Sequence, residues 1–343
     1  MKFLLVTLGS IGDLMPFLAV ADTLRQRGHQ VVLASNAGYA ALVRGSGFEF
    51  GIISDRPAQA LDETLARDPQ AAWRKVREEV FLPAVDPTRS FIAHHLQSGP
   101  CQVIASWNAF GAALAQRQFG MPLYTVYLSP QALIEDAEGS CRKIGLYPSW
   151  FGSAPDDVTL TDFPMLDDAL VPPLPPELET FLATGDAPVI FTPGSFMRRA
   201  ESFFREALAA CEHLGLRGIF LTPYSDQVPA KLPPTIRHFK FISLQRLARH
   251  GAALVHHGGI GTCAQGLRAG IPQLINPLFF DQPDNAARIE ALGAGRRYQQ
   301  GEIAERLEQL LHSQKIRESC DAIPRRFDGQ DTNRQICAIV ESA

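Results

Sequence analysis

The stretch VHHGGIGTCAQGLRAG, residues 255–270, joins an apolar strand pattern to a helix pattern through a glycine-rich turn. In such a turn several backbone N–H groups and the positive end of the helix dipole converge on one point, which favours an anion. Gly258, Gly259 and Gly261 let the backbone approach that anion closely. The stretch therefore predicts a strand and a helix of a parallel sheet, with a diphosphate bound at the turn between them.

Two side chains add to this turn. The hydroxyl of Thr262 can donate to a phosphate, and His256 stands at the strand end, from which its ring would reach a phosphate oxygen. One alternative is a tight turn whose glycines serve only backbone conformation and close packing. A second is the dinucleotide fingerprint G-x-G-x-x-A with Asp281 placed 20 residues after Gly261, which would indicate an NAD(P)-dependent oxidoreductase.

Strand and helix patterns alternate on both sides of this stretch. Near the N-terminus an apolar run at 3–8 is followed by a helix pattern at 14–28 and a strand pattern at 30–35. A strand, a helix and a strand in so short a stretch form a βαβ unit, which requires a parallel sheet. The same succession occurs at 102–129 and restarts at 188. The sequence thus predicts two doubly wound α/β domains of the Rossmann-like class.

Prolines mark the boundary between the two domains. Residues 172, 173, 175 and 176 are all proline, and they break both helix and strand patterns. Ligands of two such open sheets bind at the carboxyl ends of the strands, so the expected site is a central cleft that the two domains face. The predicted divisions are an N-terminal Rossmann-like domain at 1–163, a linker at 164–186, a C-terminal Rossmann-like domain at 187–320, and a helical segment at 321–343 that crosses back to the first domain.

Composition excludes several classes of protein. The chain has 343 residues with 46% hydrophobic and 20% charged side chains, which is typical of a folded globular protein. Its net charge of −4 argues against nucleic acid as a partner. No apolar run reaches the ~18 residues that a membrane span needs. We expect a cytoplasmic protein, and a peripheral contact with a membrane is compatible with this composition.

Metal and cofactor sites are not expected. The six cysteines form no C-x-x-C pair and no zinc-type spacing, so we interpret them as buried free thiols. No D-x-D sequence occurs, and so the metal-dependent way of holding a nucleotide sugar has no visible ligands. The chain is therefore expected to work without a metal and without a bound cofactor.

Two carboxylates are candidates for chemistry. Asp281 and Gln282 follow a strand, where a carboxylate and an amide side by side can bind adjacent sugar hydroxyls. The alternative for Asp281 is that it caps a helix starting near Pro283. Asp13, in GSIGDLMP at 9–16, is the candidate general base for an acceptor hydroxyl, and its alternative role is to cap the helix that follows.

Further candidates stand at other strand ends, and for each a plain turn or core position is the alternative. Ser195 in FTPGS is expected near the phosphates. Phe241 and Ile242 are expected to stack on a nucleobase. An apolar acceptor pocket is expected around aromatic side chains of the first domain, namely Trp107, Phe110 and Tyr127.

Three motifs taken together resemble one family. They are the N-terminal stretch at 9–29, FTPGS at 191–195, and VHHGGIGT with PLFFDQPDNA at 255–286. In this order they resemble the family 1 nucleotide-sugar glycosyltransferases of the GT-B fold. The branch that they resemble holds sterol and lipid glucosyltransferases, glycopeptide and macrolide glycosyltransferases, and rhamnosyltransferases.

The resemblance implies an inverting transfer of a hexose from a nucleoside-diphosphate sugar to a hydroxyl of a lipophilic small molecule or lipid. Asp13 would remove the acceptor proton, while His256 and the turn from Gly258 to Thr262 would stabilise the departing diphosphate. UDP-glucose and dTDP-rhamnose remain open as donor types. A sugar-nucleotide epimerase or a binding protein of the same fold remains a further alternative.

Overall fold

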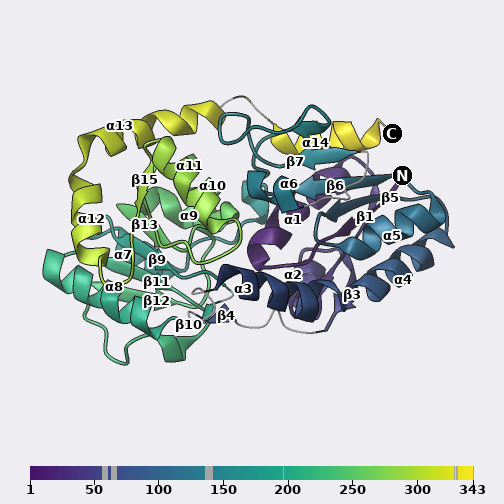
Figure 1. Cartoon of the computed structure of the whole chain (residues 1–343). Helices are drawn as coiled ribbons and strands as arrows, with labels where there is room; N and C mark the ends of the chain where they lie inside the picture. The colour runs from purple at the N-terminus through teal and green to yellow at the C-terminus, as the bar shows by residue number, and fades with distance from the viewer. Residues whose placement is uncertain are drawn as a thin grey trace. The chain divides into compact units, whose positions relative to one another are not determined.

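The computed structural model describes residues 1–55, 61–62, 68–135, 142–195, 197–327, 329 and 331–342. The chain divides into two compact units, and Figure 1 colours their elements by position along the chain. The first unit consists of Met1–Gln59, Gln70–Leu170 and Gln330–Ala343. The second consists of Ala60–Pro69 and Val171–Gly329. The first unit therefore extends to Leu170, and the longer segment of the second unit begins at Val171, inside the segment expected as a linker.

The first unit is built on a seven-stranded sheet whose order is β3-β2-β1-β5-β6-β7-β8, with every neighbouring pair parallel. Its strands are β1 Lys2–Val6, β2 Gln30–Asn36, β3 Glu49–Ser54, β5 Gln102–Ser106, β6 Leu123–Tyr127, β7 Lys143–Gly145 and β8 Val158–Leu160. Its helices and short turns of helix are α1 Ile11–Gln26, η1 Ala37–Tyr39, α2 Ala40–Gly45, α3 Pro69–Val76, η3 Arg77–Phe81, α4 Val85–Leu96, α5 Phe110–Phe119, α6 Pro130–Glu135, η4 Asp168–Leu170 and α14 Thr332–Glu341.

The second unit has a six-stranded parallel sheet in the order β12-β11-β9-β13-β14-β15, beside a two-stranded pair of β10 and β4. Its strands are β4 Leu61–Asp62, β9 Val189–Thr192, β10 Met197–Arg199, β11 Gly218–Leu221, β12 Ile236–Phe239, β13 Ala253–His256, β14 Gln273–Ile275 and β15 Gly295–Arg297. Its helices are α7 Pro176–Leu182, α8 Glu201–Leu214, η5 Ser225–Gln227, α9 Leu244–Leu247, η6 Ala248–His250, α10 Ile260–Ala269, α11 Gln282–Ala291, α12 Ile303–His312, α13 Gln314–Ala322 and η7 Ile323–Phe327.

Continuous apolar strands explain why both sheets are parallel and covered on two faces. The central strands β1 and β5 read KFLLV and QVIAS, and all their residues except Lys2 are buried. A strand buried on both faces needs apolar residues at every position rather than at every second one. Two crossover helices of the second unit, α8 and α10, end at Gly215 and Gly270, which adopt the left-handed conformation that stops a helix.

The order of strands fixes where a ligand can bind in each unit. Both sheets reverse their winding at one place, between β1 and β5 in the first unit and between β9 and β13 in the second. Loops leave the two strands at such a place in opposite directions, which opens a crevice at the carboxyl ends of the strands. Asp13 follows β1, and the glycine turn Gly258–Gly261 follows β13. Candidate residues therefore lie at both reversal points.

The last helix, α14, packs on α1 within the first unit, where Figure 1 shows it in yellow beside the N-terminal elements. Ile336, Cys337 and Val340 are fully buried. The end of the helix is held by Glu341, whose carboxylate accepts hydrogen bonds from Arg27 at 2.5 and 2.7 Å and lies 2.7 Å from His29. These bonds, those from Arg27 above all, lower the pKa of Glu341 to about 2.

We predict that Glu341→Gln lowers the free energy of unfolding by about 1 kcal/mol at pH 7, because the charge-assisted bonds to Arg27 and His29 are weakened. A carboxylate with a lowered pKa stabilises the fold above its unfolded pKa, and this contribution is lost as the pH falls through the folded pKa. The difference from the native chain should therefore shrink between about pH 5 and pH 2. Urea denaturation across this range measures it.

Glu308→Gln is the matched control, because Glu308 lies exposed on α12 and takes part in no ion pair within the described ranges. It should leave the free energy of unfolding unchanged at every pH. A Glu341→Gln variant as stable as the native chain at pH 7 would show that the carboxylate does not hold α14.

Candidate active site

The reversal point of the second sheet brings two of the predicted motifs together. β9 leads into a turn with Gly194 and Ser195, and the neighbouring β13 leads into the glycine turn. The two turns meet at the ring of His257, since a Cβ built on Gly194 would lie 2.7 Å from its Cε1. The motifs FTPGS and VHHGGIGT therefore form one local site in the second unit.

The glycine turn presents backbone donors to an anion. Gly259 is the N-cap of α10, and its carbonyl accepts a bond from the N–H of Thr262 at 3.0 Å. The N–H groups of Ile260 and Gly261, in the first helical turn, have no carbonyl of their own helix to bond. Gly258 has φ +90°, which other residues rarely adopt. The turn thus has the geometry of an anion site at a helix N-terminus.

The side chain of His256 is buried beside the glycine turn and forms its hydrogen bonds within the protein. The side chain is 1% exposed, its Nδ1 accepts a bond from the N–H of Gly258 at 3.0 Å, and its Nε2 lies 3.0 Å from the amide oxygen of Gln273. Burial lowers the pKa of His256 to about 3, so the ring is neutral and its Nε2–H donates to Gln273. Both ring nitrogens are therefore used inside the protein, and the prediction that His256 contacts a phosphate is wrong.

His257 is the histidine that lies at the turn. Its ring is packed between two glycines, because a Cβ would come within 2.7 Å of it at Gly194 and within 2.5 Å at Gly259. Burial lowers its pKa to about 4, and its Nδ1 is buried without a hydrogen-bond partner among the described residues. A buried polar atom without a partner marks a place for a ligand or a water. Successive side chains of a strand point to opposite faces, so the sequence would distinguish His256 from His257 only if the register of β13 were known.

Asp281 is placed beside the glycine turn by a strained residue and an asparagine. Phe280 has φ +58°, which is unusual for an aromatic residue. Asp281 occupies the N-cap position of α11 but makes no capping bond with its side chain. Instead, the buried Asn285 donates to Asp281 Oδ2 at 2.9 Å and to the carbonyl of Gly258 at 3.0 Å. Asn285, which sequence reasoning missed, therefore links the carboxylate to the turn.

Gln282 is only in part available to a ligand. Its side chain is 6% exposed, and its amide oxygen accepts bonds from the N–H groups of Leu278 at 2.9 Å and Phe279 at 3.3 Å. The prediction gave this amide both accepting and donating roles toward sugar hydroxyls. The structure uses its oxygen to close the loop before α11, so that accepting role is wrong and the NH₂ group alone is left for a ligand.

The remaining predicted donor residues divide into two groups. Ser195 is exposed in the turn after β9, and Phe241 is 59% exposed after β12. Both are accessible, and their roles remain predictions, as does that of the half-buried Thr262. Ile242 is 9% exposed and packs in the core with Leu247 and others, so its assignment to the nucleobase is wrong.

Asp13 lies at the reversal point of the first sheet. The helix α1 begins at Ile11 with Ser10 as its N-cap, so the alternative in which Asp13 is the cap is wrong. Asp13 completes a capping box, because its Oδ2 accepts bonds from the N–H of Ser10 at 2.6 Å and from the hydroxyl of Ser10 at 2.7 Å. Burial raises the pKa of the Asp13 carboxyl, although the bonds from Ser10 oppose this shift. No bond within the described ranges engages Oδ1.

An aromatic cluster follows β5 in the same unit. The indole rings of Trp107 and Trp73 stack at 5.6 Å between centroids, and Phe110 meets Phe81 edge to face at 6.2 Å. Trp73 and Phe81 are additions that the sequence did not suggest. Tyr127 is 1% exposed within β6, so it belongs to the core and its assignment to an acceptor pocket is wrong.

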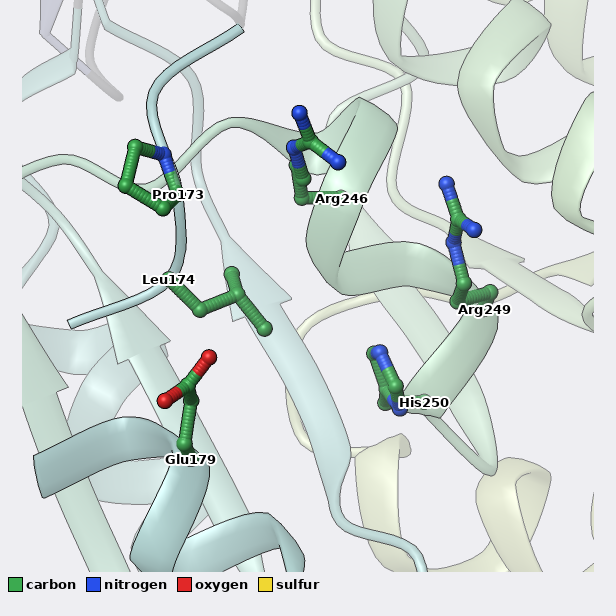
Figure 2. A pocket seen from close by; sticks show the side chains of 6 residues that line it. All are labelled: Pro173, Leu174, Glu179, Arg246, Arg249 and His250. Carbon is green, nitrogen blue, oxygen red and sulfur yellow. The ribbon is translucent and has the colours of Figure 1, made fainter. Parts of the chain in front are cut away.

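A separate cavity of about 280 Å³ lies in the second unit, where charged side chains from two segments face it (Figure 2). Its lining residues are Pro173, Leu174, Glu179, Arg246, Arg249 and His250. Arg246 also donates to the carbonyl of Val171 at 3.2 Å. Residues 246–250 precede the amino end of β13, whereas the glycine turn follows the carboxyl end of the same strand. The cavity is therefore distinct from the candidate donor site.

Among the described residues, no group of three or more His, Cys, Asp or Glu side chains is arranged to hold a metal ion. The five cysteines that the structure describes are buried and free, while Cys141 lies outside the described residues. Within the same residues, none of the helices combines the length and the apolar character that a membrane crossing demands.

Two family models match the chain in succession. Residues 3–126 match the glycosyltransferase family 28 N-terminal domain, and residues 219–328 match the erythromycin biosynthesis protein CIII-like C-terminal domain. Apart from residues 60–69, the first match falls in the first unit, and the second match falls in the second unit.

Curated relatives and solved structures agree with these models. O-mycaminosyltylonolide 6-deoxyallosyltransferase from Streptomyces fradiae is 28% identical over 87% of this chain and 85% of its own. Sterol 3-beta-glucosyltransferase from Candida albicans is 25% identical over 85% of this chain, which spans 24% of that longer protein. The spinosyn rhamnosyltransferase complexed with thymidine diphosphate has the same fold, with a TM-score of 0.81 and 18% identity over 99% of this chain and 100% of its own.

The matched models include Asp13 in the first unit and both the glycine turn and Asp281 in the second, and the relative from Streptomyces aligns along most of both chains. The chain is a glycosyltransferase, and it belongs to the family 1 glycosyltransferases of the GT-B fold.

Proposed function

We propose that this enzyme transfers a deoxyhexose from a dTDP-sugar to a hydroxyl of a lipophilic small molecule, with inversion at the anomeric carbon. One observation supports the donor part of this proposal. Within one unit, the ring of His257 packs against the glycine turn, and Asn285 links that turn to Asp281. The names of a 6-deoxyallosyltransferase and of a rhamnosyltransferase with bound thymidine diphosphate support the donor type.

The donor residues have separable roles in this proposal. The N–H groups of Ile260 and Gly261 bind the diphosphate, and the neutral ring of His257 donates to it from a position fixed by two glycines. Donors held in place before the reaction stabilise the charge that develops on the leaving group. Asp281, whose carboxylate is held by Asn285, accepts bonds from sugar hydroxyls.

Asp13 supplies the base. Its ionised carboxylate accepts the proton of the acceptor hydroxyl, whose oxygen then forms a bond to the anomeric carbon while the bond from that carbon to the diphosphate breaks. The bonding electrons leave with the diphosphate, and Asp13 later releases its proton to water. A pKa raised by burial makes the carboxylate a stronger base than an exposed aspartate.

The donor class is tested by thermal unfolding with dTDP, UDP and NAD. A ligand that binds only the folded state stabilises it by about 2.7 kcal/mol at 100 times its Kd. We expect dTDP to raise the unfolding temperature most. A larger shift with UDP would replace the donor by a UDP-sugar, and a shift with NAD alone would contradict the donor site altogether.

We expect His257→Ala and His256→Ala to differ in kind. Loss of the His257 ring removes one ligand contact and should weaken dTDP binding about tenfold with little change in unfolding temperature. Loss of the His256 ring leaves the N–H of Gly258 and the amide of Gln273 without partners, which should cost about 1–3 kcal/mol of stability. Calorimetric titration and thermal unfolding measure the two effects. Unaltered dTDP affinity in His257→Ala would remove this residue from the site.

Asp13→Asn should lower kcat by about 100- to 10,000-fold, because the amide cannot accept the acceptor proton. The affinity for dTDP should stay as in the native chain. In the native enzyme, kcat should fall on the acid side as the pH drops through a pKa above 3.8, since the protonated carboxyl is not a base. Chromatography of the glycosylated product, on an acceptor found by screening, measures the rates.

Asp86→Asn on α4 is the control for Asp13→Asn, because the side chain of Asp86 is 81% exposed and, among the described residues, pairs only with Arg89 on the same helix. It should leave kcat unchanged. An Asp13→Asn enzyme with native kcat would show that another group is the base.

A further inference from the structure

The backbone that leads to Asp13 is held from two sides by buried side chains. At Leu8, the N–H lies 3.4 Å from the hydroxyl of Ser106, and the carbonyl accepts a bond from Asn108 Nδ2 at 3.1 Å. The Ser106 hydroxyl donates to Asn108 Oδ1 at 2.6 Å. Ser106 and Asn108 are 4% and 7% exposed, so water does not compete for these bonds.

The next residue is held from the opposite flank. The hydroxyl of Tyr39, in η1, donates to the carbonyl of Gly9 at 3.2 Å. Ser106, Asn108 and Tyr39 thus form a clamp on two successive peptides, and we use that name for these three side chains. Ser106 is the last residue of β5, Asn108 follows that strand, and Tyr39 lies in η1 after β2; β5 and β2 are the two strands that flank β1.

The clamped peptides are in direct contact with the Asp13 carboxylate. Gly9 has φ +132°, and a Cβ there would lie 2.5 Å from Asp13 Oδ2. The following N–H, of Ser10, donates to the same oxygen at 2.6 Å. A small displacement of the Leu8–Gly9 backbone therefore changes both the packing and the hydrogen bond that orient the carboxylate.

We propose that Asn108 is a positioning residue for Asp13. It acts by donating to the carbonyl of Leu8, and it touches neither substrate. This inference rests on the proposed function, in which Asp13 is the base. Misplacing a catalytic group by about 1 Å can cost on the order of 100-fold in rate.

The same loop also carries Trp107, which stands between the two clamp residues and stacks on Trp73. The backbone N–H of Trp107 donates to the carbonyl of Val126 at 3.1 Å. The clamp therefore fixes the aromatic cluster and the Asp13 turn to one another. An acceptor that rests on the indole rings would meet a carboxylate at a set distance.

Asn108→Asp is the sharpest test, because it conserves shape but replaces the donating NH₂ group by an oxygen. We expect kcat to fall at least tenfold, with the KM for the donor sugar and the affinity for dTDP unchanged. Asn108→Ala should act in the same way, and Tyr39→Phe should lower kcat to a smaller degree. Thermal unfolding is measured on each variant, and Tyr39→Phe keeps the test valid if an Asn108 variant does not fold.

Asn333→Ala is the matched control, because Asn333 also donates to a backbone carbonyl of the first unit, that of Met165 at 2.7 Å, and makes no hydrogen bond with residues 8–13 within the described ranges. It should leave kcat as in the native chain. Asp13→Asn is assayed in parallel. If Asp13→Asn is inactive while folded Asn108→Asp retains native kcat, the inference is overturned and the proposed base stands. If Asp13→Asn remains active, the proposed base is wrong and no positioning role for it remains. A fall in dTDP affinity equal to the fall in kcat would show general disruption and would also overturn the inference.

Discussion

In a parallel sheet, the loops that follow the strands all lie at the carboxyl ends of the strands, and this constraint positions the candidate residues in both units. In each sheet the winding reverses once, and residues with unusual chemistry gather at that reversal. The first unit has a carboxylate with a raised pKa there, and the second has a helix N-terminus with a neutral histidine. The fold thus places a buried carboxylate at one reversal and a helix N-terminus at the other.

Each crevice is built by the same means, which is a glycine that admits a functional group to close range. Gly9 lies against the Asp13 carboxylate, and Gly194 lies against the ring of His257. Buried amides then hold the surrounding backbone, Asn108 in the first unit and Asn285 in the second. In the proposed mechanism, the polar groups that would contact substrate are therefore supported by polar groups that would not, as sites of high geometric precision require.

Sequence patterns predicted the two sheets, the three motifs and their grouping at strand ends, because apolar runs and glycine turns are local signals. They did not distinguish His256 from His257, since adjacent residues face opposite ways and the difference depends on strand register. Tyr127 and Ile242 failed for a related reason, because burial is set by what packs above a strand end. Asn285 stands four residues after Asp281 in a quoted motif, but its bond to the carbonyl of Gly258 has no local signal, and neither has the stacking of Trp73 on Trp107.

The left-handed conformation of Phe280 has a cost in stability. A non-glycine residue held in this region costs on the order of 1–3 kcal/mol, which the rest of the fold must offset. Glycine would adopt this conformation without strain, yet it would also let the loop before Asp281 explore other shapes. The aromatic residue at position 280 therefore exchanges some stability of the fold for a loop that has fewer backbone conformations open to it.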